Sequence, residues 1–194
     1  MGRIKVGVIG GSFNPPTIGH IQLIELCSKY FDIIIVIPCN KHRQKNNLIS
    51  NKHRINMLKL IKFNGGNIFI EDNNVFIKLS DKSYELFKEL KHIDSNCDLY
   101  AIFGSDNINN IKTYFNYEKL ITENNFCIVE RKGYIPENIE LFNSNPNNIF
   151  IQNNDDIVEI SSSEIRNNVN NSEYCSKYLT SEIYQYILDN HLYY

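Results

Sequence analysis

The chain contains 194 residues, of which 42% are hydrophobic and 22% charged, and these proportions are ordinary for one globular domain, expected here to span residues 1–194. Its formal net charge of −2 provides no basic face of the kind that binds nucleic acid broadly, so we expect no nucleic-acid partner. The longest apolar run, residues 33–37, is far too short to span a bilayer, so we expect no membrane partner either.

Short apolar runs alternate with amphipathic stretches along the whole chain. Strands are expected, in chain order, at residues 4–9, 33–37, 68–70, 99–103, 126–129 and 149–151. Helices are expected at residues 18–30, 52–62, 84–90 and 117–122, near residue 163, and at residues 180–190. Continuous apolar strands that alternate with helices are typical of a parallel sheet covered on both faces. The pattern therefore predicts an α/β fold, a single doubly wound (Rossmann-like) domain with a mainly parallel sheet of five to six strands, and ligands at the carboxyl ends of the strands.

The turn after the first strand carries the strongest functional signal. Residues 10–20 have the sequence GGSFNPPTIGH and lead into the first helix. Backbone N–H groups converge on an anion at such a position, which favours a phosphate site. The turn matches neither G-x-x-x-x-G-K-[ST] nor G-x-G-x-x-G, so the P-loop and dinucleotide fingerprints both fail. Thr17 and His20 share one face of the first helical turn, and Gly19 is expected to leave room for a ligand beside them.

A second polar segment, residues 160–166, has the sequence ISSSEIR. Ser162 and Ser163 can cap a helix whose N-terminus presents N–H groups to a phosphate. Arg166, one turn further along, adds a fork of donors that matches phosphate oxygens. We therefore expect this segment and residues 10–20 to form one cradle for a triphosphate.

Residues 17–20 resemble the (Thr/His)-x-Gly-His motif of a nucleotidyltransferase superfamily. The string GGSFNPP is similar to that of the nicotinate (nicotinamide) mononucleotide adenylyltransferases of the compact, bacterial type. The string ISSSEIR is similar to that family's Ile-Ser-Ser-Thr-x-Ile-Arg, and HRINML at residues 53–58 resembles its second-helix signature, whose apolar members we expect in the core. The resemblance implies adenylyl transfer from ATP to nicotinate mononucleotide, with nicotinamide mononucleotide as a second candidate acceptor, and release of pyrophosphate, in NAD biosynthesis. It also implies Mg²⁺ carried with the ATP.

Carried over residue by residue, the resemblance implies three groups of site residues. The catalytic residues are His20, Thr17 and Arg166. The residues expected to bind ATP and its phosphates are Gly10, Gly11, Ser12, Phe13, Ser162, Ser163, Arg43, Gly104 and Asp106. The residues expected to bind the pyridine nucleotide are Asn14, Ser83, Tyr84, Tyr114 and Arg131. Lys41 and Lys45 compete with Arg43 for the phosphate contact, and no metal ligands are predicted in the chain itself.

Two residues depart from the family pattern. Glu85 stands where the bacterial enzymes commonly have Thr, and its carboxylate would repel the acid of nicotinate if it pointed inward. Tyr114 replaces the usual stacking Trp, although it still offers a π-face.

The sequence leaves open which of the two mononucleotides is preferred. It also leaves open the oligomeric state, and a homo-oligomer is one of the alternatives. Alternative functions are another adenylyltransferase of the superfamily, such as one acting on phosphopantetheine, and a catalytically silent nucleotide-binding module.

The five cysteines and the many asparagines carry less information. No C-x-x-C pair is present, so a zinc site has no support, and we expect reduced thiols. No secretory leader is evident, and we expect a cytoplasmic protein. Asparagine is frequent and often paired; we interpret this as a genome-level bias expressed on surfaces and loops, which weakens asparagine as a signal of turns.

Overall fold

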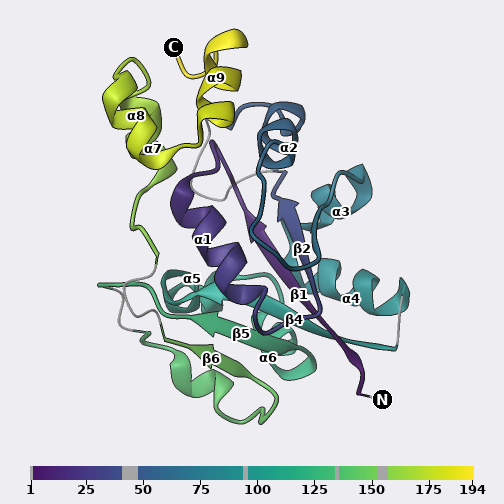
Figure 1. Cartoon of the computed structure of the whole chain (residues 1–194). Helices are drawn as coiled ribbons and strands as arrows, with labels where there is room; N and C mark the ends of the chain where they lie inside the picture. The colour runs from purple at the N-terminus through teal and green to yellow at the C-terminus, as the bar shows by residue number, and fades with distance from the viewer. Residues whose placement is uncertain (1, 41–47, 94–95, 134–135, 153–156) are drawn as a thin grey trace.

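The computed structural model of the chain describes residues 2–40, 48–93, 96–133, 136–152 and 157–194. Its six strands form one parallel sheet in the order β3-β2-β1-β4-β5-β6 (Figure 1). The strands are β1 (Ile4–Gly11), β2 (Ile33–Pro38), β3 (Ile68–Ile70), β4 (Cys97–Gly104), β5 (Asn125–Val129) and β6 (Ile149–Ile151). This is the strand order of a doubly wound sheet, so the predicted fold class is confirmed.

Helices cover both faces of the sheet (Figure 1). They are α1 (Ile18–Cys27), α2 (Asn51–Lys59), α3 (Asn74–Leu79), α4 (Ser83–Ile93), α5 (Ser105–Asn109), α6 (Tyr117–Glu123), α7 (Ser162–Asn167), α8 (Ser172–Tyr178) and α9 (Ser181–Asp189), with 3-10 helices η1 (Ile111–Thr113) and η2 (Ile139–Phe142). Helices α1, α2, α7, α8 and α9 pack into one hydrophobic cluster, the α1-side core. Helices α3, α4, α5 and α6 pack into the other, the α4-side core. Among the described residues, no helix combines the length and the apolar character needed to cross a membrane.

The central strands feed both cores with alternate residues. In β4, Leu99 and Ala101 belong to the α4-side core, whereas Tyr100 and Ile102 belong to the α1-side core. Strands β1, β2 and β5 divide their side chains in the same way. Successive side chains of a strand point to opposite faces, so a strand that is buried on both faces is apolar throughout. This is why continuous apolar runs located the strands in the sequence.

Strand β1 lies inside the sheet, with β2 on one side and β4 on the other. The winding of the chain reverses between these two neighbours, and in such sheets a crevice forms outside the carboxyl ends of the strands at the reversal. Strand β1 ends at Gly11 and β4 ends at Gly104. The two glycine-containing segments that the sequence singled out therefore lie at the same edge of the sheet.

Some helix boundaries differ from the expectation. Helix α1 ends at Cys27 instead of residue 30, because the N–H groups of Lys29 and Tyr30 bond to carbonyls three residues back and tighten the chain into a turn. Helix α2 ends at Lys59 instead of residue 62. Helices α3, α5 and α8 were not expected. They contain six, five and seven residues, too few for a helical period to be recognised.

Candidate active site

Thr17 and His20 form a hydrogen-bonded pair at the start of α1. Thr17 is the N-cap residue and is fully buried. Its backbone N–H donates to His20 Nδ1 at 3.1 Å, and its hydroxyl oxygen lies 2.7 Å from the same nitrogen. Because a backbone N–H can only donate, Nδ1 is the acceptor, and the neutral imidazole carries its proton on Nε2. The predicted pair is thus brought together, and the tautomer makes Nε2–H a hydrogen-bond donor.

Phe13 packs against this imidazole from the glycine-rich turn. Its ring lies with its centroid 5.2 Å from that of His20, at an interplanar angle of 61°. Phe13 is 1% exposed and has φ 44°, a left-handed conformation that bulky residues rarely adopt. Its ring fills the space that a side chain on Gly11 would need, whereas a Cβ on Gly10 would meet nothing within 4 Å. The turn therefore buttresses the imidazole and leaves an open surface over Gly10.

The two distant motifs are joined directly. Ser162 Oγ donates to the carbonyl of Pro15 at 2.8 Å, across 147 residues of sequence, and this contact is buried. Arg166 Nη1 donates to the carbonyl of Asn14 at 2.9 Å, across 152 residues, and its Nη2 donates to Ser163 Oγ at 3.0 Å. The guanidinium of Arg166 and the imidazole of His20 are therefore held by one turn, as the expected cradle requires.

The capping of α7 differs from the prediction. The N-cap residue is Ser161, whose hydroxyl accepts from the backbone N–H of Glu164 at 3.1 Å, while the Glu164 carboxylate accepts from the N–H of Ser161 at 3.3 Å. This is a capping box. Ser162 and Ser163 are consequently available for the contacts with Pro15 and Arg166, and they hold the two motifs together without capping the helix.

Gly19 also has a different role from the expected one. A Cβ on Gly19 would overlap the backbone carbonyl oxygen of Val158. The N–H of Val158 in turn donates to the side chain of Gln22, on the next turn of α1, at 2.8 Å. Gly19 thus lets the segment that leads into α7 lie directly on α1, and its missing side chain leaves no room for a ligand.

Gly19→Ala tests this close approach through the sign of its effect on stability. Alanine ordinarily stabilises a helix relative to glycine by about 1 kcal/mol. Here we expect a net loss of about 1–3 kcal/mol, because the added methyl group overpacks against backbone that cannot move aside cheaply. Urea unfolding of this variant, with Gly10→Ala as the control whose Cβ meets open space, measures the difference. A Gly19→Ala variant as stable as the wild-type protein would contradict the assigned role.

Arg54 was expected only as part of a helix signature, yet its side chain bonds to the backbone of the glycine-rich turn and of the segments beside it. The residue is 0% exposed. Its guanidinium donates to the carbonyls of Ser12 at 2.7 Å, Cys39 at 2.7 Å and Ile49 at 3.2 Å, and to the side chain of Asn51. All of these acceptors are neutral, and burial lowers the pKa of Arg54, an effect that nearby Cys39 opposes. A buried positive charge therefore lies behind the glycine-rich turn, the predicted phosphate site.

Asp106 and Arg131 meet at the end of β4. Arg131 Nη1 lies 3.1 Å from Asp106 Oδ2, and its Nη2 lies 2.7 Å from Glu159 Oε2. The carboxylate of Asp106 occupies the space that a side chain on Gly104 would fill. Among the described residues, Asp106 Oδ1 has no hydrogen-bond partner although it is buried. Such an oxygen suits a ligand hydroxyl, because a buried acceptor without a donor is costly.

The residues predicted for the pyridine nucleotide are less closely grouped. Tyr114 stacks obliquely near Phe103 of β4, at 5.6 Å between ring centroids, and Lys82 lies over the ring of the adjacent Phe115 at 5.1 Å. Ser83 directly follows Lys82 and is the first residue of α4. The hydroxyl of Tyr84 instead donates to Glu123, the last residue of α6, at 3.2 Å. Its hydroxyl therefore points toward the amino edge of the sheet, away from the glycine-rich turn.

Two further predictions concern phosphate and metal binding. Arg43, with its competitors Lys41 and Lys45, lies outside the described residues. Within the parts of the chain that the structure describes, no three His, Cys, Asp or Glu side chains gather as a metal site would require.

Asn14, predicted to bind the pyridine nucleotide, is buried. Its side-chain oxygen accepts from Ile49 N–H at 3.4 Å and from the hydroxyl of Tyr193 at 3.0 Å.

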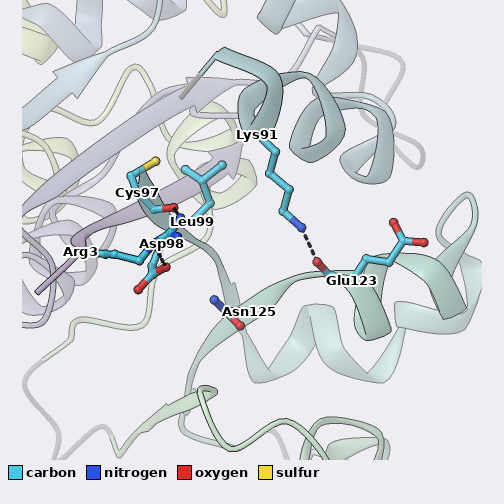
Figure 2. A pocket seen from close by; sticks show the side chains of 7 residues that line it. All are labelled: Arg3, Lys91, Cys97, Asp98, Leu99, Glu123 and Asn125. Carbon is cyan, nitrogen blue, oxygen red and sulfur yellow. Dashed lines mark hydrogen bonds and ion pairs between the residues drawn. The ribbon is translucent and has the colours of Figure 1, made fainter. Parts of the chain in front are cut away.

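A separate cavity of about 270 Å³ lies at the opposite, amino edge of the sheet (Figure 2). It is lined by Arg3, Lys91, Cys97, Asp98, Leu99, Glu123 and Asn125. Figure 2 shows its two cations already engaged: Arg3 pairs with Asp98 at 2.7 Å, and Lys91 donates to the carbonyl of Glu123. This cavity is on the far side of the sheet from His20 and Arg166, so it is not part of the candidate site.

Comparisons with known proteins agree with this geometry. A model of the cytidylyltransferase-like family matches residues 8–168. A probable nicotinate-nucleotide adenylyltransferase of Fusobacterium nucleatum is 36% identical over 179 residues, which cover 88% of this chain and 90% of the relative. One from Flavobacterium johnsoniae is 28% identical over 98% of this chain and 99% of its own. Among solved structures, nicotinic acid mononucleotide adenylyltransferase of Plasmodium falciparum complexed with NaAD superposes with a TM-score of 0.83, at 27% identity, over 98% of this chain and 97% of that one.

Proposed function

Because this chain belongs to the cytidylyltransferase-like family, and within it to the nicotinate-nucleotide adenylyltransferases, we propose that it transfers the adenylyl group of ATP to nicotinate mononucleotide. The products are the nicotinate dinucleotide and pyrophosphate, in a step of NAD biosynthesis. One observation carries the proposal: Ser162 and Arg166 bond to the same turn that carries Thr17 and His20. Phosphate-binding groups from both ends of the chain thus converge at the carboxyl edge of the sheet, where ligands bind in doubly wound folds.

The reaction needs alignment more than proton transfer. An oxygen of the mononucleotide phosphate, already ionised at neutral pH, attacks the α-phosphorus of ATP, and the bond from that phosphorus to the bridging oxygen breaks. The electron pair leaves on pyrophosphate, so no proton has to be removed from the nucleophile. The protein therefore contributes in-line positioning and donors for the charge that develops on the phosphoryl oxygens. Mg²⁺ enters as part of the MgATP substrate.

Each side chain of the cradle has a proposed task. His20 donates from Nε2 to the α-phosphate, and Thr17 holds the imidazole in that tautomer. Arg166 holds the outgoing pyrophosphate with its forked donors. The backbone of Gly10, Gly11, Ser12 and Phe13 is assigned to the phosphates, since a Cβ on Gly10 would meet open space, and the buried charge of Arg54 lies behind Ser12. This arrangement uses preorganised donors, which act only where charge develops in the transition state.

The nucleoside contacts are proposed from the remaining groups. The unpartnered oxygen of Asp106 suits a ribose hydroxyl, and Arg131 keeps the carboxylate in place. The eleven-residue helix α4 opens with Ser83, and we assign Ser83 to the carboxylate and Tyr114 to the ring of nicotinate. The phosphate contact of Arg43, the pyridine contacts of Asn14 and Tyr84, and the cytoplasmic location stay predictions of the sequence, and the oligomeric state stays open.

A pyrophosphate-release assay tests the proposal. ATP is supplied with nicotinate mononucleotide, nicotinamide mononucleotide or phosphopantetheine in parallel, and the dinucleotide product is identified by mass. We expect the highest kcat/KM with nicotinate mononucleotide. Turnover only with phosphopantetheine would favour another adenylyltransferase of the family. ATP binding without pyrophosphate release from any acceptor would favour a silent nucleotide-binding module.

A further inference from the structure

The segment after α9 returns to the floor of the candidate site. The hydroxyl of Tyr193 donates to the side-chain oxygen of Asn14 at 3.0 Å, across 179 residues of sequence. Asn14 is 1% exposed, and its backbone carbonyl is the acceptor for Arg166 Nη1. A continuous chain of contacts therefore runs from Tyr193 through Asn14 to the guanidinium that is proposed to hold pyrophosphate.

The end of α9 is built to direct Tyr193 to this position. The N–H of Leu192 bonds to the carbonyl of Ile187 at 3.0 Å, and that of His191 bonds to the carbonyl of Leu188 at 3.1 Å. With His191 at φ 49°, this is a Schellman motif, in which buried Leu192 and Ile187 supply the accompanying apolar contact. The motif turns the chain back over the α1-side core, which Leu192 joins.

Tyr193 itself has a backbone conformation that calls for an explanation. Its φ is 70°, in the left-handed region that favours glycine. A residue with a large side chain keeps such a conformation only where the surrounding structure holds it, and such residues cluster at functional sites. The Schellman turn precedes the backbone of Tyr193, and the bond to Asn14 holds its side chain.

The surroundings keep the phenol as a donor. Burial raises the pKa of Tyr193 above its ordinary value, and the neighbouring guanidinium groups of Arg166 and Arg54 oppose this effect. The hydroxyl is therefore protonated at neutral pH, with Arg166 and Arg54 among its charged neighbours. Tyr194, the next residue, is 64% exposed and belongs to neither core, so the two adjacent tyrosines differ sharply in environment.

We propose that Tyr193 is a positioning residue for adenylyl transfer: by fixing Asn14, it sets the backbone carbonyl that orients Arg166 toward the pyrophosphate end of ATP. The proposal rests on the function proposed above. Tyr193 is argued to act through the backbone carbonyl of Asn14 on Arg166, so the proposal predicts a larger effect on ATP and pyrophosphate than on the mononucleotide, which only the predicted pyridine contact of Asn14 would transmit.

Tyr193→Phe removes the hydroxyl and keeps the ring, and Tyr194→Phe is the matched control. We expect Tyr193→Phe to lower kcat/KM for MgATP about three- to ten-fold, the effect of one lost hydrogen bond, and to weaken pyrophosphate binding in calorimetry by a similar factor. The KM for nicotinate mononucleotide should stay within about twofold, and Tyr194→Phe should match the wild-type protein. In an Arg166→Ala background, Tyr193→Phe should have no further effect, because its action passes through Arg166.

Two outcomes would overturn the proposal. One is a Tyr193→Phe variant that matches Tyr194→Phe in both MgATP kinetics and pyrophosphate binding. The other is a loss that is equal for both substrates and persists in the Arg166→Ala background, which would indicate general support of the fold. If the wild-type chain made no dinucleotide, the proposed function would fail, and the pyrophosphate calorimetry alone would still decide the role of Tyr193.

Discussion

Replacing His20 with alanine is expected to lower kcat by about 10²–10⁴-fold, the range for removing a preorganised donor to developing charge. The structure supplies the reason for a loss of that size. The imidazole is held by Thr17 in the tautomer with its proton on Nε2, and the ring of Phe13 packs against it. The donor is thus oriented before substrate binds, and a water molecule in its place would have to be ordered during each turnover.

Because His20 also accepts the N–H of Thr17, the alanine variant loses a helix-capping contact together with the catalytic donor. His20→Asn separates the two roles, since an amide oxygen can accept that N–H but has no donor at the Nε2 position. We expect His20→Asn to recover the stability that His20→Ala loses and to stay as inactive. His92→Ala, on the exposed end of α4, is the control for a histidine outside the site. Near-wild-type turnover of His20→Asn would remove Nε2 from the mechanism.

The sequence predicted the sheet well because burial on both faces leaves a local signature. Each central strand contains a continuous run without charged residues, so its existence could be recognised without knowing its neighbours. The doubly wound arrangement was expected from the handedness of parallel crossovers, and the structure adds the strand order β3-β2-β1-β4-β5-β6. Two helices that are capped by asparagine residues were missed. Asn73 and Asn171 accept from Val75 N–H and Tyr174 N–H and cap α3 and α8, two helices that the interpretation of asparagine as compositional bias concealed.

The site was predictable only in part, because most of its contacts join residues far apart in the chain. Spacing alone placed Thr17 and His20 on one face of a helix. The meeting of residues 10–20 with residues 160–166 was expected from the shared ligand, and the structure confirms it through Ser162 and Arg166. Gly19 was misread because no local pattern shows that Val158 lies against it. The bracing by Arg54 and Tyr193 likewise depends on acceptors that only the folded chain brings within reach.

Arg166→Ala is expected to lower kcat/KM for MgATP by about 10²-fold, because it removes charge-assisted donors to pyrophosphate, each worth about 1.5–3 kcal/mol. The KM for the mononucleotide should change little. Arg166→Lys keeps the positive charge but loses the forked guanidinium that reaches Asn14 and Ser163 together. Its kcat/KM for MgATP should therefore fall between that of Arg166→Ala and that of the wild-type protein.

The pattern across substrates decides where Arg166 acts. Initial rates are measured with each substrate varied in turn, and product inhibition by pyrophosphate is measured as well. Together they separate an effect on MgATP and pyrophosphate from an effect on the mononucleotide. Arg3→Ala removes an arginine that pairs with Asp98 at the opposite edge of the sheet, and it controls for the loss of one positive charge from the protein. If Arg166→Ala raised the KM for the mononucleotide and left pyrophosphate inhibition intact, Arg166 would belong to the acceptor side. The chain of contacts from Tyr193 would then end on the acceptor phosphate as well, since Asn14 links the two residues.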